Sequence, residues 1–111
     1  MKKSWNEHEK RVIQFLIDES GKLPEIERAL LFGSRARRDG GERADFDVAI
    51  FAPGLSHTKW AVWAGGVKEN APTLCGLDLI LVTDTLAEGL REVINKDGKC
   101  FYGKNQPSKF K

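Results

Sequence analysis

The sequence predicts an α/β fold, because helical and strand-like patterns alternate along the chain and two short segments are almost wholly apolar. These segments, residues 46–51 and 77–82, have the composition of strands that are covered on both faces. The stretch between them, from Ser56 to Pro72, is long enough for a crossover helix. We therefore expect the two strands to be parallel neighbours.

The length of 111 residues predicts one domain, which we assign to residues 1–103, followed by a polar, flexible tail over residues 104–111. The composition, 41% hydrophobic and 31% charged, is typical of globular proteins. No apolar run approaches the roughly 20 residues that cross a bilayer, and the polar start lacks a signal core. We therefore expect no membrane association and a cytoplasmic location. The two cysteines are too few for a disulfide framework, and a net charge of +2 does not predict direct nucleic-acid binding.

The first helix is predicted from a capping box and an apolar stripe. Ser4 is the expected N-cap, with Glu7 reaching back to it, and Gly21 is the expected end. The residues that share the inner face are Val12, Ile13, Leu16 and Ile17.

The first strand is expected within residues 26–32, where apolar residues thicken before a Gly-Ser break. A turn follows at residues 39–41, and the second strand, residues 46–51, ends at Pro53-Gly54.

Ser56 is the expected cap of the next helix, whose inner stripe consists of Trp60, Trp63, Ala64 and Val67. Gly65-Gly66 weakens this helix and favours a break there. The third strand is residues 77–82.

The last helix is expected to be capped by Thr83 or Asp84 and to end at Gly98. Its expected inner face consists of Leu86, Leu90, Val93 and Ile94. Residues 100–102 are expected to add a short edge strand.

Three aspartates stand where acidic residues are unusual. Asp45 and Asp47 open the second strand on one face, and Asp78 lies within the third strand. If the two strands are parallel neighbours, these carboxylates approach closely and repel one another unless protons or cations neutralise them. Carboxylates without a nearby histidine or thiolate suit hard cations, which means Mg²⁺ or Mn²⁺. Each aspartate taken singly could equally be an ordinary polar residue at a strand end.

The segment that begins at Gly33-Ser34 is a second candidate, for anion binding. It reads as a strand, a Gly-Ser turn and a helix start, a pattern that lets the backbone approach a phosphate. The Ser34 hydroxyl could bind the phosphate, although capping of the helix would also explain a serine here. Four arginines raise the local positive potential, namely Arg35, Arg37, Arg38 and Arg43. We expect at least two of them to be solvated surface residues.

Gly33-Ser34 followed after ten residues by Asp45-Phe46-Asp47 resembles the signature of the DNA polymerase beta-type nucleotidyltransferase superfamily. The wider match, over residues 32–39 and 44–50, is similar to the minimal nucleotidyltransferase (MNT) branch. Asp78 fits the third carboxylate of that branch, and residues 90–102 resemble its closing helix and strand. The chain departs from the family at Ala44, where serine is frequent, and at Arg38, where glycine is common.

The resemblance implies a small mixed sheet flanked by helices and a metal-dependent enzyme that transfers a nucleoside monophosphate, AMP from ATP, to a hydroxyl group. By this resemblance Asp45, Asp47 and Asp78 are catalytic and hold two Mg²⁺ or Mn²⁺ ions, with Asp78 as general base. Gly33 and Ser34 bind the β- and γ-phosphates, and Arg35 neutralises the pyrophosphate. These roles follow from the family and not from spacing.

Stand-alone chains of this size resemble the antitoxin of HEPN/MNT toxin–antitoxin pairs, in which the acceptor is a tyrosine of the HEPN partner. Two alternatives stay open. One is an antitoxin that binds its partner without catalysis, although such a protein has no need of an acid cluster. The other is an adenylyltransferase for a small molecule, although such enzymes usually carry an additional helical domain.

Overall fold

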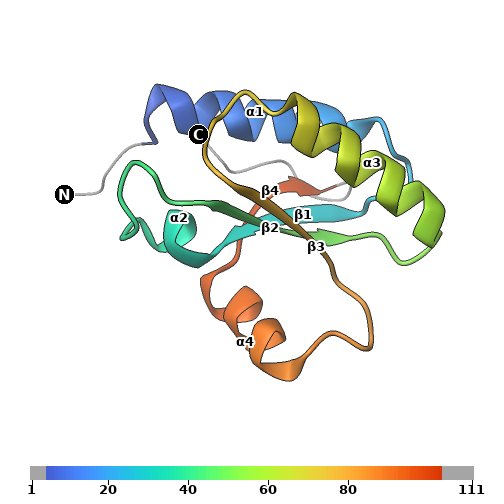
Figure 1. Ribbon diagram of the computed structural model, residues 1–111. Coiled ribbons are helices and arrows are strands. Elements are labelled where there is room, and N and C mark those ends of the chain that lie inside the picture. Colours follow the sequence, from blue (N-terminus) through green and yellow to red (C-terminus); the bar gives the residue numbers. More distant parts are fainter. Residues whose placement is uncertain (1–4, 104–111) are drawn as a thin grey trace.

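A computed structural model describes residues 5–103, which form alternating helices and strands (Figure 1). The elements in chain order are α1 (Glu7–Gly21), β1 (Arg28–Phe32), α2 (Gly33–Arg37), β2 (Phe46–Phe51), α3 (His57–Asn70), β3 (Leu77–Leu81), α4 (Glu88–Asp97) and β4 (Lys99–Gly103). The predicted tail, residues 104–111, lies outside the described residues.

The strands form one mixed sheet in the order β3-β2-β1-β4. β1 is antiparallel to both β2 and β4, whereas β2 and β3 are parallel. The parallel pair is the one that the crossover length predicted, and α3 makes the crossover. The expected α/β class and the mixed sheet are therefore confirmed.

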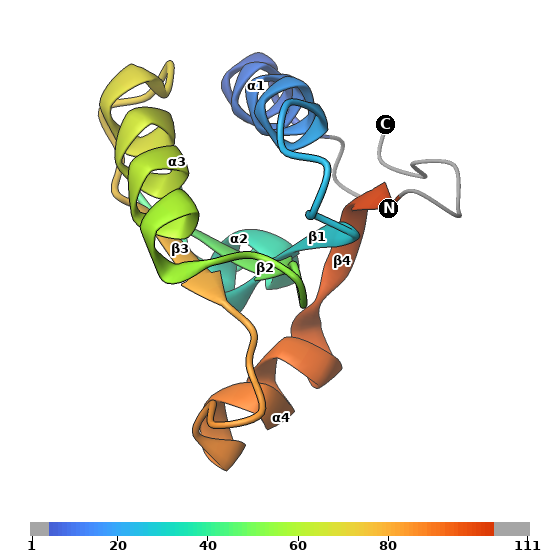
Figure 2. The ribbon, with the colours of Figure 1, turned by 90° about the vertical axis from the view of Figure 1, so that its right-hand side faces the viewer.

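Helices cover both faces of the sheet. α1 and α3 lie on one face and α4 lies on the other, as Figure 2 shows. The larger core cluster lies under α1 and α3 and includes Leu16, Val48, Val67 and Phe101. A smaller cluster lies between the sheet and α4 and is centred on Phe32, Ala49 and Ile94. Within residues 5–103 the larger of the two core clusters therefore lies on the α1 and α3 side of the sheet.

The apolar face predicted for α1 lies against the core, but the helix begins two residues later than a cap at Ser4 predicts. Asn6 is the N-cap, and its side chain accepts a hydrogen bond from the backbone N–H of Glu9 while the Glu9 carboxylate accepts one from the Asn6 N–H. Ser4, the cap expected from the sequence, lies outside the described residues. The expected pairing with Glu7 is wrong, because Glu7 is already the first helical residue.

α3 starts at the predicted cap, since the Ser56 side chain accepts a hydrogen bond from the Lys59 N–H. The break expected at Gly65-Gly66 does not occur, and the helix continues to Asn70. Packing explains this result, because Trp60 and Trp63 lie against the large core cluster on one side of the glycines and Val67 is buried in it on the other. No helix within residues 5–103 is long and apolar enough to cross a membrane.

α4 begins after Ala87, so neither Thr83 nor Asp84 caps it. The carbonyl of Thr83 instead accepts the Leu86 N–H and closes a turn ahead of the helix. Of the four residues expected on its inner face, Leu90 and Ile94 pack in the small cluster, whereas Val93 is 39% exposed. Leu86 also packs there, but it lies before the helix. The edge strand predicted at residues 100–102 is confirmed as β4.

Candidate functional site

The predicted carboxylates and the Gly-Ser turn meet at one end of the sheet. In the parallel pair, Asp47 lies directly opposite Asp78. In the antiparallel pair of β1 and β2, Asp47 lies opposite Phe32, the residue that precedes Gly33. The strand register therefore brings Asp47, Asp78 and the start of α2 together, as the expected pairing of strands required. The chemical roles of these residues stay predictions.

The carboxylates lie on the α4 face of the sheet. Phe46 belongs to the core cluster under α1 and α3, so strand alternation directs its neighbours Asp45 and Asp47 to the opposite face. In β3, Ile80 packs in the α4 cluster, and Asp78, two residues earlier, shares its face. α4 does not cover this end, because Asp45 and Asp78 are exposed and Asp47 is half-buried. The acids are thus accessible to a ligand from solvent.

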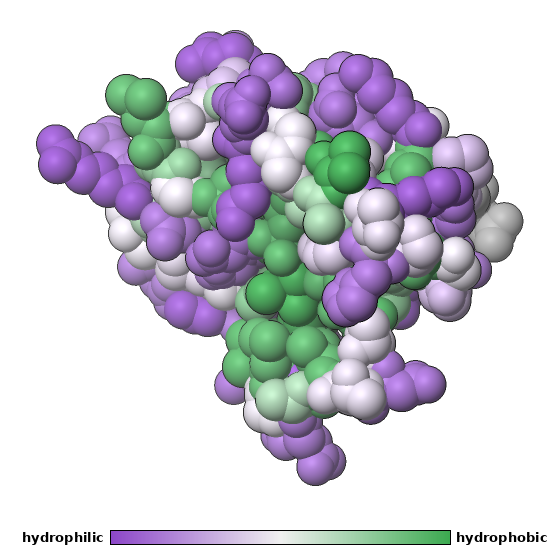
Figure 3. All heavy atoms as spheres, turned by 45° about the vertical axis from the view of Figure 1, so that its right-hand side comes forward, coloured by the Kyte–Doolittle hydropathy of each residue, from purple (hydrophilic) through white to green (hydrophobic). Residues whose placement is uncertain are grey.

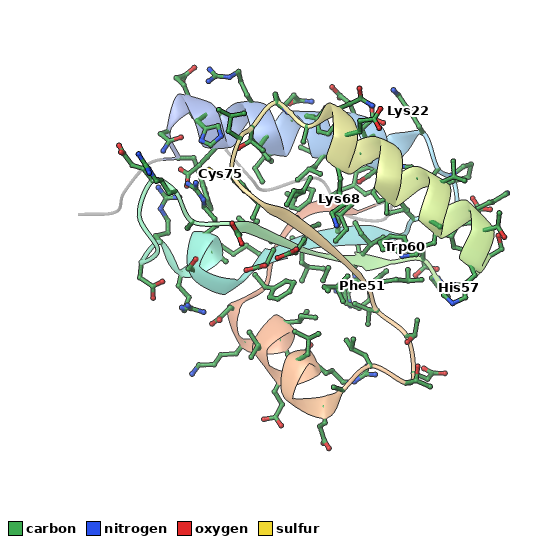
Figure 4. The ribbon with its side chains drawn as sticks, viewed as in Figure 1. Lys22, Phe51, His57, Trp60, Lys68 and Cys75 are labelled. Carbon is green, nitrogen blue, oxygen red and sulfur yellow. The ribbon has the colours of Figure 1, made fainter. Side chains whose placement is uncertain are left out.

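The loop that precedes β3 closes the same end of the sheet. The backbone N–H of Gly76 donates a hydrogen bond to Asp45, with 3.2 Å between the nitrogen and Oδ1. Cys75 lies at this end of the molecule, whereas Phe51 and His57 lie at the other (Figure 4). The loop therefore holds the exposed Asp45 side chain at the start of β2.

The electrostatics of the cluster converge on Asp47. Burial raises the pKa of the Asp47 carboxyl above its ordinary value, and the negative charges of Asp78 and Asp45 raise it further. A hydrogen bond with the Asp78 carboxyl acts in the same direction, while the positive charge of Arg37 opposes these effects. At this carboxyl, burial and the neighbouring carboxylates thus outweigh the positive charge of Arg37.

Gly33 gives the Gly-Ser turn its close approach to Asp47. Its φ is +74°, in the left-handed region that L side chains rarely adopt. A Cβ atom at this position would collide with Oδ2 of Asp47. Ser34 follows as the second residue of α2, whose N-cap is Phe32, so capping of the helix does not explain this serine.

Arg35, for which the family resemblance implies neutralisation of the pyrophosphate, lies inside the protein. Its side chain is 3% exposed, and the guanidinium pairs with Glu9 at 3.0 Å between Nη1 and Oε2. It also donates hydrogen bonds to the carbonyls of Ala44 and Glu42 and lies over the ring of Phe46. This arrangement ties α1 and α2 to the loop before β2 and engages Arg35 away from the acid cluster.

Arg37 is the arginine whose charge acts on Asp47. It is exposed, and its guanidinium pairs with Asp39 and with Asp97 at the end of α4. Arg37 could not be chosen over its neighbours from the sequence, because a helix as short as α2 has no apolar stripe that determines which side faces the sheet.

Glu9 is a second residue that sequence reasoning missed, and its role is structural. Burial by itself raises the pKa of the Glu9 carboxyl, but the hydrogen bond from the Asn6 backbone and the Arg35 and Arg38 guanidinium groups outweigh burial, so the pKa is lowered. Because the pKa is lowered, the ionised Glu9 side chain stabilises the fold at pH values above the ordinary glutamate pKa. This contribution is lost as the pH falls through the folded-state pKa of Glu9.

Replacement of Glu9 by alanine is expected to lower the free energy of unfolding by about 3–5 kcal/mol at neutral pH, because Arg35 stays buried without its partner. Urea denaturation measures this loss. Glu7→Ala is the matched control in the same helical turn, since its side chain is 81% exposed and its ion pair with Lys10 contributes at most about 1 kcal/mol. Equal losses in the two variants would contradict the structural role of Glu9.

The donor set of the acid cluster fits a hard cation. Its ligands would be carboxylate oxygens, and a divalent ion would offset the effects of burial and of the Asp78 and Asp45 charges that raise the pKa of Asp47. Within residues 5–103 the side chains do not, however, already form a group of three or more His, Cys, Asp or Glu residues placed to hold a metal. Asp47 and Asp78 are the residues that would hold it, with Asp45 beside them.

The family comparison covers most of the chain. Residues 10–107 match the family described as polymerase beta, nucleotidyltransferase. No curated protein sequence is similar enough to count as a relative.

Solved structures share the fold at low sequence identity. A crystal structure of a toxin–antitoxin with AMP-PNP has a TM-score of 0.64 at 20% identity, over 91% of this chain and 77% of that one. A putative nucleotidyltransferase from Sulfolobus solfataricus has a TM-score of 0.61 at 20% identity, over 89% and 83%. The complex of a tri-AMPylated Shewanella oneidensis HEPN toxin with an MNT antitoxin has a TM-score of 0.57 at 22% identity, over 89% and 72%.

Proposed function

Because the chain belongs to the polymerase beta-type nucleotidyltransferase family, we propose that it transfers AMP from ATP to a hydroxyl group of a protein partner. The observation that carries this proposal is the strand register, which places Asp47 opposite Asp78 and beside the Gly33-Ser34 turn. A phosphate-binding turn next to a cluster of carboxylates is the arrangement that nucleotidyl transfer requires.

The chain's own residues have distinct roles in this proposal. The turn at Gly33-Ser34 binds the β- and γ-phosphates. In place of Arg35, for which the family resemblance implies neutralisation of the pyrophosphate, we propose Arg37, because its charge acts on Asp47. Mg²⁺ or Mn²⁺ ions held by the aspartates would polarise the α-phosphate and neutralise charge on the departing pyrophosphate.

Asp78 is the proposed general base, because it is the exposed carboxylate on the edge strand, where an acceptor arrives from solvent. It accepts the proton of the acceptor hydroxyl as the oxygen forms a bond to the α-phosphorus of ATP. The bond between that phosphorus and the bridging oxygen of pyrophosphate breaks, and pyrophosphate leaves with the bonding electrons.

The proposed partner is a HEPN-family protein, with a tyrosine hydroxyl as acceptor and inactivation of a toxin as the outcome. Support comes from the toxin–antitoxin complexes that share the fold, one with AMP-PNP and another with an AMPylated HEPN toxin. The direct experiment incubates the purified chain with ATP, Mg²⁺ and a HEPN-family protein, and measures the mass of the HEPN protein by mass spectrometry. A gain of AMP is expected, and an unchanged mass would contradict the proposal.

Binding of Mg²⁺ and ATP together is expected to raise the melting temperature, because a ligand that binds the folded state stabilises it by about 2.7 kcal/mol at 100 times its Kd. For a chain of this size such stabilisation corresponds to a shift of roughly 10 °C. Differential scanning fluorimetry measures the shift, with ATP in EDTA and Mg²⁺ alone as controls that are expected to move it less. An unmoved melting temperature at saturating concentrations would mean that this cluster is not a nucleotide site.

A further inference from the structure

One edge of the sheet carries backbone groups that no strand of residues 5–103 pairs. β3 is an edge strand and pairs with β2 only. The Gly76 carbonyl and the Val82 N–H both bond to residues at the ends of β2, at 2.8 and 2.9 Å. Because strand residues alternate, Leu77, Leu79 and Leu81 direct their N–H and C=O groups away from β2. This edge therefore offers a ladder of donors and acceptors to an added strand.

The β3 edge lacks the lysines, prolines and bulges that commonly keep sheet edges from pairing, and Asp78 is its one charged residue. Its register with β2 is continuous from Leu77 to Leu81, and the strand contains neither lysine nor proline. The opposite edge, β4, begins with the exposed Lys99 and has a register irregularity beside Ala29 and Leu30. Natural proteins blunt free edges by such means, so the regular β3 edge, whose one charged side chain is Asp78 of the acid cluster, is typical of a strand that another chain covers.

The edge is continuous with the acid cluster. Asp78 and Ile80 alternate along β3, and with Val82, the residue directly after the strand, they share the α4 face of the sheet. Ile80 and Val82 are only partly buried, and they pack, like Leu86 and Leu90, against the small cluster between the sheet and α4. Figure 3 shows apolar side chains gathered above α4 on this side of the molecule. A strand added here would place one side chain beside Asp78 and the next ones on the same face over an apolar strip.

We propose that the β3 edge binds an extended segment of the protein acceptor as a fifth strand, and thereby delivers its hydroxyl side chain to Asp78. The inference rests on the proposed function and adds how the acceptor is recognised. An extended segment is required because a helix satisfies its own backbone groups and leaves the edge ladder unpaired. The Cβ atom of the added-strand residue that lies directly opposite Asp78 would be roughly 4.5–5.5 Å from the Asp78 Cβ atom. A tyrosine has a longer side chain and would reach the carboxylate from the diagonal position.

A second copy of this chain fits the edge less well. Antiparallel pairing of two β3 strands near their centres places Asp78 opposite Asp78, opposite Ile80 or opposite Val82. The first register brings like charges together, and the others cover a carboxylate with an apolar side chain. A hydroxyl opposite Asp78 has neither penalty, because it donates a hydrogen bond to the carboxylate.

Amide exchange in the complex with the HEPN protein tests this inference at single residues. The Leu79 and Leu81 amides face outward and are expected to exchange at least about tenfold more slowly in the complex than in the free chain. The Ile80 amide faces β2 and is the internal control, with little change expected. A complex that still accepts AMP while Leu79 and Leu81 exchange as before would overturn the edge inference and leave the proposed function standing.

A matched pair of variants separates the backbone of Leu79 from its side chain. Leu79→Pro removes the outward N–H, at an edge position where proline is tolerated, and Leu79→Ala keeps it. We expect Leu79→Pro to weaken HEPN binding at least about tenfold relative to Leu79→Ala, measured by titration calorimetry, with ATP affinity equal in both.

Equal HEPN affinities in the two folded variants would overturn the inference. So would a dimer of the free chain that Leu79→Pro dissociates, because a second copy would then cover the edge. Absence of HEPN binding and AMP transfer in the wild type would instead refute the proposed function itself, together with the inference that rests on it.

Discussion

Replacement of Asp47 by asparagine is expected to lower AMP transfer at least about 10³-fold, comparable to removing a principal electrostatic stabiliser from an active site. The change conserves size but removes a charge from the carboxylate that lies opposite Asp78 and beside Gly33. Mass spectrometry of the HEPN protein after timed incubation with ATP and Mg²⁺ measures the effect. Asp18→Asn, an exposed position on α1, is the control and is expected to retain full activity.

The Asp47→Asn variant is also expected to have a higher free energy of unfolding than the wild type when metal is absent. The pKa of Asp47 is raised in the folded state, so the folded chain binds this proton more tightly than the unfolded chain does. Stability therefore falls as the pH rises from the ordinary aspartate pKa through the raised value, and the ionised carboxylate is destabilising at neutral pH. Asparagine removes this cost, so the melting temperature at pH 7 in EDTA is expected to rise.

An opposite pair of results would favour a binding protein without catalysis. In that case Asp47→Asn would still protect cells fully from the HEPN partner, and the wild-type chain would leave the mass of the partner unchanged. Loss of transfer together with a raised melting temperature would instead be typical of a charge kept for function at the expense of stability.

The fold was predictable because the sequence patterns that specify it, two apolar strands and a crossover helix, can be recognised without knowledge of the tertiary contacts. The apolar segments of β2 and β3 and the crossover between them specify a parallel pair, and this pair fixes Asp47 near Asp78. Element ends were less predictable. Two overlapping capping boxes, Ser4 with Glu7 and Asn6 with Glu9, fit the sequence equally well. Only the burial of Glu9 against Arg35 distinguishes them.

The roles of the arginines could not be predicted for a related reason. Arg35 and Arg37 are two residues apart on a short helix, so they project to different sides of it. The side of α2 that faces the acid cluster depends on how α1 and α4 pack, because Arg35 pairs with Glu9 of α1 and Arg37 with Asp97 of α4. Both partners are far from the Gly-Ser turn in the sequence. Arg38, at the position where the family commonly has glycine, adopts a left-handed φ of 68° and pairs with Glu9. Its conformation explains why glycine suits this position.

Replacement of Gly33 by alanine is expected to have the second-largest effect on activity, because two penalties coincide at this residue. The positive φ is strained for alanine, and its methyl group would collide with the Asp47 carboxylate. Either the carboxylate or the start of α2 must move. A displacement on the order of 1 Å at a reacting group can lower the rate about 10²-fold, so a loss of at least that size in AMP transfer is expected.

Gly41→Ala provides a control that separates strain from collision. Gly41 also has a positive φ, of +80°, but a Cβ atom there would meet nothing within 4 Å. Both variants are expected to lose about 1–2 kcal/mol of unfolding free energy through backbone strain, measured by urea denaturation. Only Gly33→Ala is expected to lose transfer, because only Gly33 lies against the carboxylate that faces Asp78. Equal transfer by the two variants would mean that the contact between the Gly-Ser turn and Asp47 has no part in the reaction.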